Sequence, residues 1–139
     1  MEAMETETQA IVQRLGALLL EEERVRLAYL FGSLARGRTH RTSDVDVAVL
    51  YAPGFDAGDR LRLNLDLAFR LSRQLKVTVD IIDLAAARAS LKHQVLRDGL
   101  LVLERDHAER VAFEVSARRG YLDLRRHLEK RARAILGRL

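Results

Sequence analysis

The chain has 139 residues, of which 48% are hydrophobic and 32% are charged, with no cysteine and one proline. This composition is that of one ordinary globular domain, long enough to bury a core without metal or disulfide staples, and it excludes cysteine ligands and cysteine nucleophiles. No apolar run approaches the roughly 18 residues that span a bilayer, and the acidic start MEAMETETQA is unlike a signal peptide. We therefore expect an intracellular, cytoplasmic protein with no membrane contact, and the modest net charge of +4 gives little reason to expect nucleic acid.

Apolar residues in the first part of the chain recur at helical spacing, and then the period changes to the alternation of strands. A cap at Thr6 or Thr8 would begin the helix. The segment between the two alternating stretches reads GSLARGRTHRTS and is typical of a loop or a short helical turn. The predicted elements are a helix at about 8–23 and strands at 25–31 and 44–51.

The rest of the chain alternates helices with strands, with a loop at APGFDAG and a β-branched stretch at KVTVDIID. The predicted elements are helices at about 58–75, 87–99 and 107–137, with strands at 76–83 and 100–104. This order indicates an α/β or α+β fold, a small mixed β-sheet flanked by helices. We predict a single domain over residues 1–139, with a core at about 8–104 and a C-terminal helix at about 107–137.

Two carboxylates stand two positions apart on the second predicted strand. Asp44 and Asp46 therefore point to one face of the sheet, while Val45, Val47 and Val49 point to the other. Adjacent carboxylates repel each other unless cations lie between them. Their hard oxygen ligands favour Mg²⁺, with Mn²⁺ as an alternative, and a metal pair is typical of phosphoryl or nucleotidyl transfer.

A third carboxylate, Asp80, lies on the next predicted strand, which would have to neighbour the strand that carries Asp46. Its expected role is to bind one metal and to hold, or deprotonate, an acceptor hydroxyl. Asp83 falls on the other face of that strand and is interpreted as a helix cap. The four histidines, at positions 40, 93, 107 and 127, show no metal-ligand spacing, so none is assigned to zinc.

Gly32 and Ser33 follow the first predicted strand and suit a phosphate. The glycine lets the backbone turn tightly and approach a ligand, and the serine offers a hydroxyl beside backbone N–H groups. Arg36 either contacts a triphosphate or holds the loop by hydrogen bonds. Ser43 is expected to shape the local backbone, and the cations and histidine at 38, 40 and 41 are expected to form a solvated basic loop.

The pattern GSxARGxxxxxSDxDxxV, which starts at Gly32 and includes Asp44 and Asp46, resembles the signature of the DNA polymerase β-type nucleotidyltransferase superfamily. Its form and the short chain most resemble the minimal nucleotidyltransferases. The resemblance implies the polymerase β-type fold, ATP with its β- and γ-phosphates at Gly32 and Ser33, and two Mg²⁺ at Asp44 and Asp46, with Asp80 on the catalytic ion. It also implies an antitoxin that transfers AMP from ATP to a tyrosine of a HEPN-domain toxin.

Two other functions remain open at this stage. Relatives that transfer a nucleotide to a small hydroxylated molecule share the motif, although they usually carry a further domain that shapes the acceptor pocket. Alternatively, the chain is a binding module that silences a toxin by occupying it. The apolar stripe of the C-terminal helix is expected to pack for the most part on the sheet or on a second copy, which leaves a homodimer open, and otherwise to dock a partner protein. Its residues are Val111, Val115, Leu122, Leu128, Ala132, Ile135 and Leu139.

Overall fold

The computed structural model describes residues 2–32 and 44–138, with side chains from residue 7 onward. Within these residues, four strands form one mixed sheet in the order β3-β2-β1-β4, in which only the β2 and β3 pair is parallel. This confirms the predicted fold class. The strands are β1 (Val25–Phe31), β2 (Val45–Tyr51), β3 (Val79–Asp83) and β4 (Leu100–Glu104). The helices are α1 (Glu2–Leu20), α2 (Ala57–Leu75), α3 (Ala89–Asp98) and α4 (His107–Leu136).

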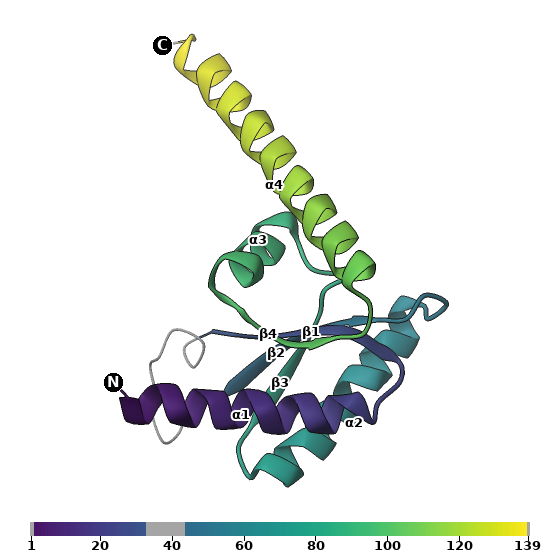
Figure 1. Cartoon of the computed structure of the whole chain (residues 1–139). Helices are drawn as coiled ribbons and strands as arrows, with labels where there is room; N and C mark the ends of the chain where they lie inside the picture. The colour runs from purple at the N-terminus through teal and green to yellow at the C-terminus, as the bar shows by residue number, and fades with distance from the viewer. Residues whose placement is uncertain (1, 33–43, 139) are drawn as a thin grey trace.

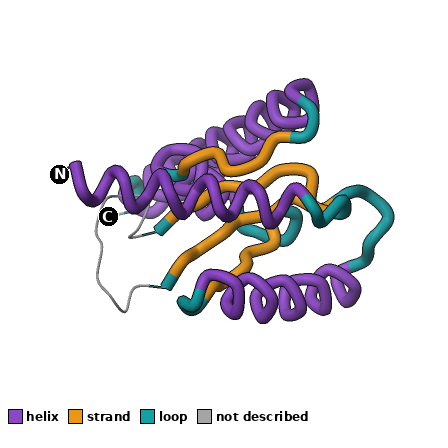
Figure 2. Tube along the Cα trace, turned by 60° about the horizontal axis from the view of Figure 1, so that its bottom comes forward, coloured by secondary structure: helices purple, strands orange, loops and turns teal. Residues whose placement is uncertain are grey.

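Helices cover both faces of the sheet. Figure 1 shows α1 and α2 on one face and α3 with the start of α4 on the other. Alternate residues of β1 therefore enter two cores: Leu30 packs with Leu15 of α1, whereas Tyr29 packs with Val95 of α3. Burial on both faces explains why six of the seven residues of β1 are buried. The tube view in Figure 2 shows the same layers from a second direction.

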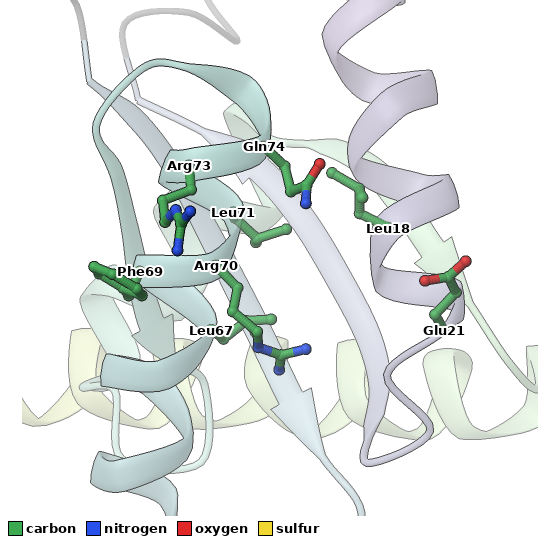
Figure 3. Close-up of a pocket in the computed structure, with 8 residues that line it drawn as sticks. All are labelled: Leu18, Glu21, Leu67, Phe69, Arg70, Leu71, Arg73 and Gln74. Atoms are coloured by element: carbon green, nitrogen blue, oxygen red, sulfur yellow. The ribbon is translucent and has the colours of Figure 1, made fainter.

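The layer of α1 and α2 is grooved. A cavity of about 390 Å³ lies between the two helices. Figure 3 shows Leu18 and Glu21 on the α1 side and the other lining residues on α2. The lining residues include none of the predicted site residues, so this groove is separate from the predicted site.

Helix α1 begins earlier than its periodicity predicts. It starts at Glu2 and ends at Leu20, so Thr6 and Thr8 lie inside it, and their assignment as caps was wrong. The first residues are rich in glutamate, alanine and methionine, which are strong helix formers. The high helix propensity of these residues therefore extends α1 toward the N-terminus, beyond its apolar stripe.

Strand β3 is shorter than the predicted strand at 76–83. Lys76 adopts a left-handed conformation with φ 57°, which ends α2 and leaves the next residues in the connection. Asp83 is the last residue of β3. Its carboxylate accepts from the Ala85 N–H at 3.0 Å and pairs with Arg60 at 2.7 Å. Asp83 therefore caps a turn, and its interpretation as a helix cap was wrong.

Helix α4 is attached to the sheet through its first half. Arg26 of β1 pairs with Glu109 at 2.6 Å, and the buried Tyr29 hydroxyl donates to Glu114 at 2.8 Å. Farther along, Tyr121 stacks on His93 of α3, with ring centroids 3.6 Å apart. No helix in the described part of the chain combines the length and the apolar surface that crossing a membrane requires.

Candidate active site

The parallel pairing of β2 with β3 brings the predicted carboxylates to one end of the sheet. Asp46 and Asp80 stand opposite each other in the register, which confirms the adjacency inferred for their strands. Val45, Val47 and Val49 are buried on the opposite face, as the alternation predicts. Asp44 is exposed and precedes β2 by one residue, so the strand begins one position later than predicted.

Gly32 brings the end of β1 to the same place. Phe31 pairs with Asp46 across the β1 and β2 ladder, so the next residue lies beside the Asp46 side chain. Gly32 has φ +84°, and a Cβ built on it would overlap Asp46 Oδ2. Both facts require glycine. Asp46 of this chain therefore lies against Gly32, a contact that the sequence did not reveal, and the predicted approach of a ligand to Gly32 stays a prediction.

The three carboxylates share one electrostatic environment. Burial raises the pKa of Asp46 above its usual range, and the negative charges of Asp80 and Asp44 raise it further. Asp46 is partly buried, whereas Asp44 and Asp80 are exposed. A cation beside Asp46 would relieve this repulsion, and exposed neighbours leave room for a ligand to reach it.

The donor chemistry of this end of the sheet suits a hard divalent cation, since carboxylate oxygens are the ligands that Mg²⁺ prefers. Within the residues that the structure describes, however, no three histidine, cysteine, aspartate or glutamate side chains already form a group able to hold a metal ion. The fit therefore rests on the type of donor and on the burial and carboxylate repulsion that raise the pKa of Asp46.

Helix α2 holds β3 at both ends and so positions Asp80. At the start of the strand, the Val79 N–H donates to Ser72 Oγ at 2.9 Å. At the other end, Asp83 pairs with Arg60. Neither Ser72 nor Arg60 was singled out in the sequence. Their partners lie 7 and 23 residues away, beyond any local pattern.

Several predicted site residues lie outside the described part of the chain. Ser33, Arg36 and Ser43 are among them, as are the basic-loop positions 38, 40 and 41. Their roles stay predictions. Of the other histidines, His93 stacks on Tyr121 and His107 bonds to Glu104 at 2.8 Å.

Comparison with protein families gives one match. Residues 13–108 match the family described as polymerase beta, nucleotidyltransferase. This range covers more than half of the chain and contains Gly32 and the three carboxylates.

A curated relative with a similar sequence is the protein adenylyltransferase MntA of Shewanella oneidensis. It is 41% identical over 76 residues, which make up 55% of this chain and 52% of that protein. The chain therefore matches about half the length of this relative.

Solved structures extend the similarity over most of the chain. One is a toxin–antitoxin crystal structure with AMP-PNP, with a TM-score of 0.65 and 31% identity over 87% of this chain and 92% of that chain. Another holds a tri-AMPylated Shewanella oneidensis HEPN toxin in complex with an MNT antitoxin. Its TM-score is 0.62, with 27% identity over 93% of this chain and 96% of that chain.

Proposed function

Because the chain belongs to the polymerase beta nucleotidyltransferase family, we propose that it transfers AMP from ATP to a tyrosine hydroxyl of a HEPN-domain toxin. The transfer neutralises the toxin, so the chain acts as its antitoxin in the cytoplasm. The observation that carries the proposal is the pairing of Asp46 with Asp80, beside Asp44 and Gly32. The adenylyltransferase relative and the similar complex with a tri-AMPylated toxin support the reaction and the partner.

The carboxylates and the residues after β1 have different roles in the proposed site. Asp44, Asp46 and Asp80 would hold two Mg²⁺ ions, for which Mn²⁺ is an alternative. When bound, these ions supply the positive charge that offsets the triphosphate and the developing pyrophosphate. Gly32 and Ser33 receive the β- and γ-phosphates, and Arg36 either contacts the triphosphate or fixes the loop.

The transfer itself is a substitution at phosphorus. The tyrosine oxygen attacks the α-phosphorus of ATP and forms a new P–O bond, while the bond to the bridging oxygen breaks and pyrophosphate leaves. Asp80 is the second residue of β3 and is exposed, so an acceptor can reach it. It orients the tyrosine hydroxyl and takes its proton.

The enzyme and the binding module differ in whether neutralisation of the toxin requires the carboxylates. The double variant Asp44→Asn, Asp46→Asn keeps the fold but loses the charges needed for transfer. We expect the wild type with ATP and Mg²⁺ to abolish the ribonuclease activity of the HEPN protein, and the double variant to leave that activity intact although it still binds. Asp66→Asn, an exposed carboxylate on α2, is the control that should neutralise normally. Full neutralisation by the double variant would instead establish the binding module.

A further inference from the structure

The second half of α4 carries an apolar seam that has no partner within the described chain. In the first half of the helix, Phe113, Ala117 and Tyr121 face α3 and the sheet. The same face continues at intervals of three and four residues through Leu124. It then reaches a set of exposed positions, here called the distal seam: Leu128, Ala132 and Ile135.

The distal seam lies beyond the body of the protein. Figure 1 shows α4 passing α3 and extending past it with no other element alongside. Every residue from 125 to 138 is exposed, and the side chains of Leu128 and Ile135 are 54% and 60% exposed. A helix face that is buried in its first half and equally apolar in its second half indicates a surface that is covered by another molecule.

The charge of the second half of α4 indicates which kind of molecule covers the distal seam. Residues 118–138 contain eight lysines and arginines against two acidic residues, a charge of +6. The whole chain carries +4, so the remaining residues carry −2. Two copies of this helix side by side would repel each other. The seam therefore fits an acidic partner rather than a second copy of the chain.

The apolar residues favour a protein over a nucleic acid. A phosphate backbone offers cations a partner but gives Leu128 and Ile135 nothing apolar to contact. An amphipathic helix with acidic flanks would cover the seam and pair with the arginines on either side. A cavity of about 410 Å³ between α3 and α4 continues the seam toward the body, with Arg97, Arg118 and Arg125 among its lining residues.

The direction of α4 connects this surface to the candidate active site. β4 pairs antiparallel with β1, so α4 begins at the end of the sheet opposite Gly32. It then runs back past α3 while rising away from the sheet (Figures 1 and 2). Figure 2 shows its C-terminus on the side of the molecule where β1 ends and β2 begins. A protein held along the seam stands on the side of the carboxylates.

We propose that the distal seam and the adjoining α3–α4 cavity dock an acidic amphipathic helix of the protein that accepts the nucleotide. This proposal rests on the proposed function in one respect: it takes the docked protein to be the protein that receives AMP. Docking on α4 holds the acceptor and leaves the carboxylates free to react with it. The acceptor is thus selected by a surface outside the active site.

The test compares full-length variants with the HEPN-domain protein as the probe. Leu128→Asp with Ile135→Asp breaks the seam, and Arg126→Glu with Arg131→Glu lowers the charge of residues 118–138 from +6 to +2. Leu65→Asp is the matched control, since Leu65 of α2 is 65% exposed and belongs to the other helix layer. Binding is measured by calorimetry, AMP transfer by KM and kcat for the acceptor, and folding by thermal unfolding.

Both distal variants should weaken binding and raise KM for the acceptor at least tenfold, with kcat within twofold of the wild type. Leu65→Asp should change neither value. Unchanged affinity and KM in both distal variants would overturn the proposal. The proposal would also be overturned if the only effect of the distal substitutions were to convert a dimer into a monomer, as measured by light scattering. Loss of binding to a single-stranded RNA as their only effect would overturn it as well.

These outcomes also separate the two proposals. A HEPN protein that binds through the distal seam but receives no AMP would contradict the proposed function alone. A HEPN protein that receives AMP with an unchanged KM in the distal variants would contradict the docking surface alone.

Discussion

The backbone of Gly32 lies directly against the carboxylate of Asp46, so a side chain at position 32 would occupy the space of Asp46 Oδ2. Gly32 directly follows β1, and Asp46 is the second residue of β2. This contact fixes the carboxylate where the end of β1 meets the β2 and β3 pair. The geometry of the candidate site thus depends on the absence of a side chain as much as on the acids.

Gly32→Ala should therefore damage both stability and activity. Alanine at φ +84° is strained by about 1–2 kcal/mol, and its Cβ displaces Asp46. We expect AMP transfer to fall about 100-fold, as for a catalytic group moved by about 1 Å. Gly54→Ala is the control, because Gly54 has φ +103° with no atom within 4 Å of its Cβ position. Equal losses of activity in both variants would show that strain, and not the displaced carboxylate, is responsible.

Asp46→Asn should stabilise the protein in the absence of divalent cations. Asp46 is partly buried and faces the charges of Asp80 and Asp44, which raise its pKa. Removing its charge should raise the free energy of unfolding at pH 7. Mg²⁺ should raise the melting temperature of the wild type and have little effect on the variant. A variant that melts lower than the wild type in EDTA would contradict this account of the repulsion.

Acid should destabilise the fold through Glu22. Hydrogen bonds from Arg24 at 2.6 Å and from Arg70 at 2.8 Å lower the pKa of Glu22 from its ordinary value of 4.5 to about 2. Because the folded-state value is depressed, this stability is complete above pH 4.5 and is lost as the pH falls toward 2.

Glu22→Gln tests this prediction. The variant should lose about 2 kcal/mol at pH 7, less than the full shift implies because both arginines are half exposed. Its stability should also change less between pH 5 and pH 2.5, measured by urea unfolding. Glu23→Gln, at the exposed neighbouring position, should follow the wild type. If the stability of Glu22→Gln fell with pH as steeply as that of the wild type, the assignment of the acid sensitivity to Glu22 would be refuted.

Ser72→Ala should loosen the start of β3. The hydroxyl of Ser72 accepts from the Val79 N–H, one residue before Asp80. Leaving that part-buried N–H without a partner should reduce the free energy of unfolding by about 1 kcal/mol. Amide exchange at Val79 should become faster than in the wild type. Ser116→Ala, an exposed serine on α4, is the control and should leave exchange at Val79 unchanged.

Local periodicity predicted the parts of the fold that depend on burial. The alternation of Val45, Val47 and Val49 located β2 within one residue, because each inward position must be apolar. The adjacency of β3 also followed from the carboxylates, since Asp80 has a role at this site only if its strand neighbours β2.

Other features depend on contacts between residues that are distant in sequence. No local pattern shows that Asp83 meets Arg60 across 23 residues, so its assignment as a helix cap failed. The second role of Gly32 was hidden for the same reason, since the strand pairing that brings Asp46 beside it is a tertiary feature. The stripe predicted on α4 was wrong in its first half, because Val111, Val115 and Leu122 are exposed. Phe113, Ala117 and Tyr121 pack there instead, and only the packed fold shows which face of the helix meets α3 and the sheet.

The central claim is AMP transfer to a protein tyrosine, and one labelling experiment tests it directly. The purified chain is incubated with α-labelled ATP, Mg²⁺ and the HEPN-domain protein, and the modified residue is identified by mass spectrometry. The same reaction is run with Asp80→Asn. We predict label on a tyrosine of the HEPN protein that disappears with Asp80→Asn. A HEPN protein that stays bound and unlabelled, or is labelled equally by Asp80→Asn, would contradict the account.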